Sequence, residues 1–481
     1  MNGAQVRGCA GAPVRVALAV AVALAFLLAF PSAQVSGGLT GAAQINRVYD
    51  AILDARFGDV PALLTETCPP APRQVCGLLD TVALWWQIQL DPDNTSRDAL
   101  FQSKVDASIA AMDAWTRAEP RRAEAWFYLG GAYGARGQHR VLRHQVLSAA
   151  RDGKRIKEAL ERSLSLDPDL KDAYFGIGLY HYYADVAPAA AKLLRFLLLL
   201  PGGDRTEGLQ EMLRARNGGQ LLRSEADYQL HIIYIWYEHE PLKAIELVNG
   251  LRARYPHNPH FPQVVAEIQD VYLHDLTASL RSWQELLALA QSGTVLEPGM
   301  AEARARLGMA TQLDRLYETD LAVDQLRAVI AAQPQSPYGA VAQAQQQLRR
   351  ANDRLADRAY RLSLEGWRAL QRGAPDEAAR ALSQSLSLRP DPVTRYRQAR
   401  VLIAQRNTAA ALPILETLVR QRSSTPPTFY ADACVDAARI HEQLGDRARA
   451  IELYTTARGV FGADQRTKDL ARREVDRLSG R

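Results

Sequence analysis

The histidines that lie near acidic residues or near one another are the first candidates for chemistry. His441 and Glu442 match the start of a zinc-protease helix, in which a second histidine follows four residues after the first. Gly445 occupies that position, so the motif is incomplete. His257 and His260 could offer two metal ligands, but they flank Asn-Pro beside the expected end of a helical unit. A solvated turn is the more ordinary structure for such a segment.

Nucleophiles and phosphate-binding loops are equally incomplete. Cys434 and His441 are seven residues apart, and two turns of helix would separate them by roughly 10 Å, too far for a thiolate pair. No Gly-x-Ser-x-Gly elbow occurs. Residues 201–205 contain two glycines but lack the Lys and Ser/Thr of a phosphate loop, so Asp204 and Glu207 are expected to form a helix-capping box. We therefore predict no catalytic residue, no metal, no cofactor and no enzyme activity.

Two cysteines do indicate a covalent feature. Cys68 and Cys76 bracket a proline-rich loop, and no histidine or further cysteine lies nearby to complete a metal site. In an oxidising compartment such neighbours favour a disulfide over two free thiols. A loop this short would stabilise the fold by roughly 2–3 kcal/mol on the chain-entropy estimate. We expect a Cys68–Cys76 disulfide.

The N-terminus predicts the compartment. Arg7 and Arg15 are the only charged residues before Gln34, residues 16–30 are all apolar, and small residues follow. This is the pattern of a signal peptide, expected here over residues 1–33. The alternative is an uncleaved anchor, although 15 apolar residues are fewer than the roughly 20 that cross a bilayer as a helix. We expect an exported protein of a bacterium, in the periplasm or facing the outside.

Composition narrows the class of partner. The chain is 47% hydrophobic and 23% charged, as a folded protein is, and its net charge is only +5. Lys and Arg do not cluster with interleaved aromatics, so nucleic acid is not an expected partner. After the leader no apolar segment is long enough to span a membrane. Ala, Leu, Arg and Gln dominate, which favours helices.

One motif points to the elements that must hold these residues. Trp126-x2-Leu129-Gly130-x2-Tyr133 resembles the first helix of a tetratricopeptide repeat (TPR), a helical hairpin with a period near 34 residues. In that family, glycines and alanines sit where two helices touch, and large residues fill the gaps. Degenerate copies recur at Tyr174 with Gly178, Tyr228 with Ala244, residues 261–290, Leu307 with Gly308, Gly366 with Ala378, Tyr396, and Ala438 with Ala450.

The resemblance implies the fold class and the organisation of the chain. It implies an all-α, helical-hairpin solenoid of the TPR type, a right-handed superhelix, after the signal segment. Residues 34–120 are expected to form degenerate N-terminal hairpins with the Cys-bracketed loop. Residues 121–465 are expected to form repeats with two insertions, near 140–154 and 187–222. Residues 466–481 are expected to form a charged capping helix.

The resemblance also implies candidate contact residues. Family positions that line the concave face of the superhelix fall here on aromatic side chains: Phe127, Phe175, Tyr182, Tyr183, Trp236, Tyr237 and Trp367. Exposed aromatics in a groove are typical anchors for a protein or peptide. The open alternative is that the long hairpins cover the groove and these rings are core.

These observations favour an exported, non-enzymatic scaffold that binds a protein or peptide partner in the cell envelope. Two other functions stay open. The first is an enzyme whose site is built from the N-terminal region and the insertions. The second is a binder of small molecules or glycans through the aromatic groove.

Overall fold

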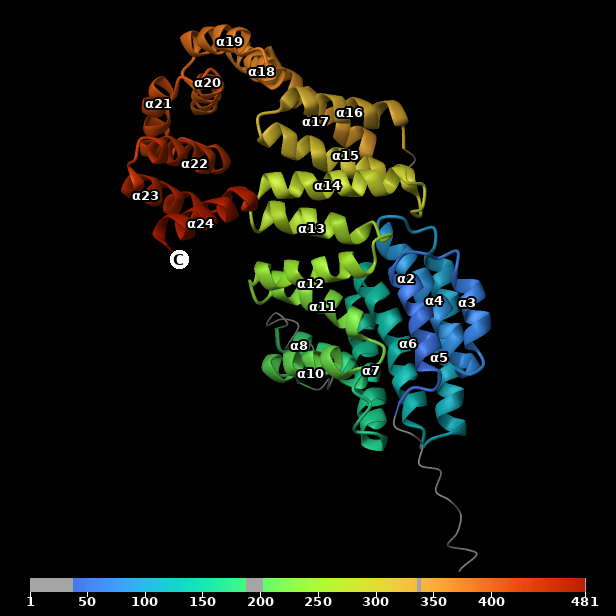
Figure 1. Cartoon of the computed structure of the whole chain (residues 1–481). Coiled ribbons are helices and arrows are strands. Elements are labelled where there is room, and N and C mark those ends of the chain that lie inside the picture. Colours follow the sequence, from blue (N-terminus) through green and yellow to red (C-terminus); the bar gives the residue numbers. More distant parts are fainter. Residues whose placement is uncertain (1–37, 187–201, 335–338, 481) are drawn as a thin grey trace, which may run out of the picture.

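The computed structural model describes residues 38–186, 202–334 and 339–480 (Figure 1). Within these ranges the regular elements are 22 α-helices and no strand, so the predicted all-α class is confirmed. In the same ranges no helix combines the length and the apolar character that a membrane span requires. The predicted signal segment, residues 1–33, lies outside the described residues.

Most of the helices follow one another in packed pairs. Four helices come first: α2 (Ala42–Leu53), α3 (Val60–Thr67), α4 (Arg73–Leu90) and α5 (Asp98–Ala118). The next pairs are α6 (Ala123–Leu142) with α7 (Val146–Leu166), α8 (Ala173–Val186) with α10 (Arg205–Gly218), α11 (Arg223–Trp236) with α12 (Pro241–Arg254), α13 (His260–Val271) with α14 (Leu276–Gln291), and α15 (Pro298–Arg315) with α16 (Thr319–Ala332). After α17 (Ala340–Ala356) come α18 (Arg358–Gln371) with α19 (Pro375–Leu388), α20 (Pro392–Ala404) with α21 (Thr408–Arg420), α22 (Pro427–Gln443) with α23 (Arg447–Arg458), and the terminal α24 (Gln465–Ser479).

Small residues at fixed places bring the paired helices together. A Cβ atom on Gly130 of α6 would lie 2.6 Å from Leu160 of α7, and one on Gly366 of α18 would lie 2.7 Å from Leu382 of α19. No side chain fits at such a distance, so glycine lets the large residue of the partner helix fill the space. Because this contact recurs along the chain, the predicted helical-hairpin solenoid is confirmed.

The two predicted insertions have different structures. Additional residues between Tyr133 and Pro168 lengthen both helices of that hairpin, to 20 residues in α6 and 21 in α7. The second insertion includes residues 187–201, which are not described, and then α10. The side chain of Asp204 accepts a hydrogen bond from the backbone N–H of Glu207, so the predicted N-cap of α10 is confirmed.

Helix α17 interrupts the alternation, and the sequence patterns did not predict it. It packs against α16 and α15, which makes a group of three helices between two regular pairs. In Figure 1 the stack changes direction after α17, and the helices from α18 onward curve back toward α13 and α14. Arg281 of α14 then binds the carboxylate of Asp464, just before α24, at 3.1 Å. The C-terminal half of the solenoid therefore closes on itself.

The N-terminal helices lie along the flank of the repeats (Figure 1). Tyr255, at the end of α12, donates a hydrogen bond to Asp50 of α2 at 2.8 Å. In the following turn, Asn258 donates to the carbonyl oxygen of Leu53 at 2.6 Å, and His257 binds Asp54 at 2.8 Å. The predicted solvated turn at residues 257–260 is solvated only in part, because His257 is exposed whereas α2 covers Asn258 and leaves it 1% exposed.

Candidate functional site

The predicted aromatic stripe is mostly core. Phe127, Phe175 and Tyr182 are 5%, 7% and 0% exposed, so these three rings are not accessible to a partner. Tyr182 packs edge to face on both Tyr183 and Tyr237, with ring centroids 5.7 and 5.9 Å apart, and Tyr183 meets Tyr237 at 5.6 Å. The three tyrosines therefore form one cluster between α8 and α11 instead of a row along a groove.

The two tryptophans of the predicted set differ in their surroundings. Trp236 is 64% exposed at the end of α11. Trp367 of α18 is half-buried, and its indole N–H donates to Glu318 at 2.8 Å while the guanidinium of Arg397 lies 5.6 Å from its ring. Trp236 is thus the one member of the set with a largely free ring, and partner contact by it stays a prediction.

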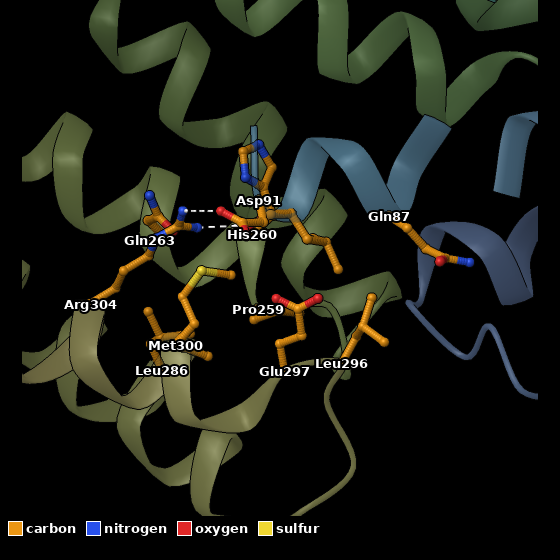
Figure 2. A pocket seen from close by; sticks show the side chains of 12 residues that line it. Gln87, Asp91, Pro259, His260, Gln263, Leu286, Leu296, Glu297, Met300 and Arg304 are labelled. Carbon is orange, nitrogen blue, oxygen red and sulfur yellow. Dashed lines mark hydrogen bonds and ion pairs between the residues drawn. The ribbon is translucent and has the colours of Figure 1, made fainter. Parts of the chain in front are cut away.

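A seam between the N-terminal helices and the repeats contains a small cavity lined by both apolar and polar side chains (Figure 2). Arg304 of α15 reaches across it, donating to the carbonyl oxygen of Leu90 at 2.7 Å and lying 3.4 Å from Asp91. Burial raises the pKa of Asp91 from its ordinary value, and Arg304 opposes this shift. The cavity has a volume of about 20 Å³, which is room for one water, and the side chains around it join the N-terminal helices to α15.

The two histidines that could have been metal ligands face different partners in this region. His260 hydrogen-bonds the hydroxyl of Tyr228 at 3.0 Å, and burial together with Arg304 lowers its pKa to about 4. His257 turns instead to Asp54 of α2. The pair therefore does not converge on a common point, since His257 binds helix α2 and His260 joins the start of α13 to α11.

The closure of the C-terminal half rests on shared helix caps. One carboxylate oxygen of Asp275 accepts from the N–H of Ala278 in α14 at 2.9 Å, and the other accepts from the N–H of Gln465 in α24 at 2.8 Å. One side chain thus caps two helices whose first residues are far apart in sequence. Burial raises the pKa of Asp275 above its ordinary value.

A groove opens beside this closure, and we call it the closure groove. Its open volume is about 270 Å³, and it lies where the turn before α14, the end of α15, the start of α22 and the turn before α24 meet. The lining residues are mainly apolar or aromatic: His274, Leu276, Arg315, Leu316, Pro426, Pro427, Thr428, Phe429, Phe461 and Gly462. Four segments that are distant in sequence therefore build one concave surface.

The aromatic side chains of the closure groove are held in different ways. Phe429 packs on Tyr317 and Tyr396, each with ring centroids 5.7 Å away, which fixes its position. Phe461 contacts the ring of His274 at 5.2 Å but remains 64% exposed. Gly462, the next residue, has φ +81, a conformation that a side chain would strain. The turn thus presents an aromatic ring to solvent at the edge of the groove.

The structure does not assemble a nucleophile from the candidates in the sequence. Cys434 is fully buried, and burial raises the pKa of its thiol to about 11, so the thiol stays protonated. His441 lies between Glu416, 3.0 Å from one ring nitrogen, and Asp446, 3.3 Å from the other. These contacts are structural ion pairs between α21, α22 and the start of α23. Cys68 and Cys76, by contrast, are joined in a disulfide between α3 and α4, as predicted.

One group of side chains in the described residues could hold a metal ion. His181 of α8 and Glu207 and Glu211 of α10 each offer one ligand atom, and these atoms lie within 4.8 Å of one another. The Nδ1 atom of His181 is 2.8 Å from Glu211. This group has no signature in the sequence, because His181 and Glu211 are 30 positions apart and belong to no local motif.

Comparison with known proteins supports no assignment beyond the fold. No protein-family model matches the sequence, and no curated protein matches it. Among solved structures, the P58(IPK) TPR domain is 11% identical, with 84% of this chain and 99% of that chain covered and a TM-score of 0.28. A tetratricopeptide repeat protein from Parabacteroides merdae ATCC 43184 is 15% identical, with 60% and 97% covered and a TM-score of 0.28. The TPR2AB domain of yeast Sti1 in complex with pHSP90 is 13% identical, with 53% and 96% covered and a TM-score of 0.24.

This chain has a TPR-like fold. Scores as low as these carry no argument by themselves, so the statement rests on the helix pairs and on the recurring contact between a glycine and a large residue. The successive helix pairs run from α6 to α23, with α17 as an additional helix.

Proposed function

We propose that this TPR-like chain is an exported, non-enzymatic scaffold of the cell envelope, and that it binds a protein partner at the closure groove. The observation that carries the proposal is a concave, mostly apolar surface that four distant segments build and that Phe461 borders. A partly exposed aromatic ring beside an apolar groove is the usual form of an anchor point for a protein segment.

The lining of the closure groove indicates the chemistry of the partner segment. Leu276, Leu316, Pro427 and Phe429 offer apolar walls, so an apolar or aromatic side chain of the partner would fill the groove. Arg315 at the edge is already paired with Asp270, so it contributes little net charge. We therefore expect binding that depends weakly on salt.

Export is supported by features outside the groove. Residues 1–33 have the pattern of a signal peptide, and a disulfide such as Cys68–Cys76 is typical of an oxidising compartment. N-terminal sequencing of the native protein tests this part of the proposal. A mature chain that begins near Gln34 supports export, and an intact Met1 on a cytosolic protein refutes it.

Site-specific crosslinking tests the groove. A photo-crosslinking residue replaces Phe461, and a matched variant carries the same residue at Leu444, which is 68% exposed beyond the end of α22 and does not line the groove. We expect one dominant protein adduct from Phe461 in living cells and none from Leu444. The adduct should disappear when Phe429→Ala is added. Equal adducts from both positions would refute a binding role for the groove.

A further inference from the structure

We propose that His181, Glu207 and Glu211 form a binding site for a divalent transition metal, with Zn²⁺ preferred over Mg²⁺ and Ca²⁺. The three side chains come from two helices of one pair, α8 and α10. They are remote in sequence from the closure groove, and none of them lines it. The site is therefore separate from the proposed partner surface.

The backbone contact between α8 and α10 holds the three ligands in place. A Cβ atom on Gly178 would lie 2.6 Å from the carbonyl oxygen of Gly208, and one on Gly208 would lie 2.6 Å from the carbonyl oxygen of Gly178. The two helices thus touch backbone to backbone at this point. His181 follows Gly178 by almost one turn, and Glu207 and Glu211 lie before and after Gly208. The close contact between α8 and α10 at Gly178 and Gly208 therefore limits how far His181 can move away from Glu207 and Glu211.

The separations fit a small cation. Zn²⁺ binds nitrogen and oxygen ligands at about 2.0–2.2 Å, so ligand atoms in a tetrahedral site are about 3.4 Å apart. The ligand atoms here lie within 4.8 Å of one another. His181 and Glu211 are hydrogen-bonded at 2.8 Å, so a bound ion would take the place of this hydrogen bond.

The charges also favour a cation. Glu207 and Glu211 are four residues apart on one helix, and like charges at this spacing repel each other. Glu207 makes no ion pair with another described residue, and the ion-pair partner of Glu211 is His181. Arg214, one turn further along α10, has its guanidinium 4.4 Å from the ring centroid of Tyr174. A divalent ion would neutralise both carboxylates at once.

The ligand types select the metal. One imidazole nitrogen with two carboxylate oxygens suits Zn²⁺ and its transition-metal neighbours. Ca²⁺ takes six to eight oxygen ligands, and Mg²⁺ prefers oxygen in octahedral geometry, so this set serves neither well. Three protein ligands leave a fourth coordination position of the ion free. This position would face the surface, because Glu207 is exposed. Water would fill that position, and the bound ion would join α8 to α10.

Titration of the full mature chain with Zn²⁺ tests the proposal. After removal of metals with a chelator, calorimetry should show one Zn²⁺ bound per chain. His181→Gln and Glu207→Gln should each weaken binding by more than the roughly 10–100-fold that changes around metal ligands cause. Mg²⁺ and Ca²⁺ should not compete at equal concentration.

His441→Gln is the matched control. His441 also lies between two carboxylates, but Glu416 and Asp446 contact opposite ring nitrogens, so the three cannot share one ion. This variant should bind Zn²⁺ as wild type does. If His181→Gln fails to fold, the exposed Glu207→Gln carries the test. Absence of Zn²⁺ binding by wild type, or unchanged binding by Glu207→Gln, would overturn the proposal.

Discussion

Asp432→Asn should stabilise this protein above pH 7 and leave its stability almost unchanged near pH 4. Asp432 of α22 lies at the closure, where it accepts a hydrogen bond from Thr467 of α24 at 2.9 Å. Burial is the largest cause that raises its pKa to about 6, and Asp436 and Asp464 add to the shift. Thr467 and Arg400 oppose it. Ionisation of Asp432 is therefore less favourable in the folded state than in the unfolded state.

The direction and the size of this effect on stability follow from the pKa of Asp432 in the unfolded and in the folded state. Asp432 has an ordinary pKa of 3.8 and a folded pKa of about 6, so the folded state binds the proton more tightly than the unfolded state does. Stability from this group is highest below pH 3.8, falls as the pH rises to about 6, and stays reduced above that. A shift of about two units corresponds to roughly 3 kcal/mol at 1.36 kcal/mol per unit, and solvent relaxation would leave roughly 1–3 kcal/mol.

Urea unfolding of wild type and Asp432→Asn at pH 4 and pH 8 measures the effect. The amide oxygen of asparagine keeps an acceptor for Thr467 and removes the charge, so the midpoint should rise at pH 8 only. Asp469→Asn on α24 is the control, because Asp469 is an exposed partner of Arg472 and its loss should change stability by less than about 0.5 kcal/mol. A loss of stability at pH 8 in Asp432→Asn would refute the reasoning.

Three further predictions concern packing and the disulfide. Ala378→Leu should destabilise the fold by roughly 1–3 kcal/mol, because Ala378 is 0% exposed and its carbonyl oxygen faces Gly366. Thermal or urea unfolding measures this loss, and an unchanged midpoint would contradict the packing. Tyr182→Ala should lower the free energy of unfolding by about 3–5 kcal/mol, because the ring is fully buried. Trp236→Ala should leave the melting temperature nearly unchanged, because its ring is 64% exposed. Equal losses of stability in the two variants would show that this difference in burial is wrong. Reduction of Cys68–Cys76 should cost roughly 2–3 kcal/mol, and non-reducing peptide mapping of native protein should recover the two cysteines as one linked peptide, not as free thiols.

Local patterns in the sequence were enough to predict the helical hairpins. The spacing of Trp126, Leu129, Gly130 and Tyr133 places one small and several large residues on one helix face, and the same periodicity recurs in later hairpins. Helix caps were readable for the same reason, as Asp204 shows. These signals involve residues within one or two turns of one another, so they do not depend on where the rest of the chain lies.

The candidate contact residues were predicted less well, because burial is decided between hairpins. The family register makes Tyr182 equivalent to Trp236 and Tyr183 equivalent to Tyr237, which suggested a continuous stripe. In the structure the rings of Tyr182 and Tyr237 instead pack edge to face, with centroids 5.9 Å apart. Trp236, one position before Tyr237, stays exposed. A single-helix pattern cannot separate these outcomes, since the neighbouring helix determines which face is covered.

The amino-acid sequence by itself determined the class of fold, the paired helices, the loop that the disulfide closes and the pattern of a leader. Only the tertiary structure decided that α17 redirects the stack, that α2 covers the turn after α12, and that the end of the chain returns to α14. Each of these features rests on a few contacts between residues far apart, such as Asp275 with Gln465 at a separation of 190 positions. Such contacts have no periodic signature, because their partners meet only after the curvature of the whole solenoid has accumulated.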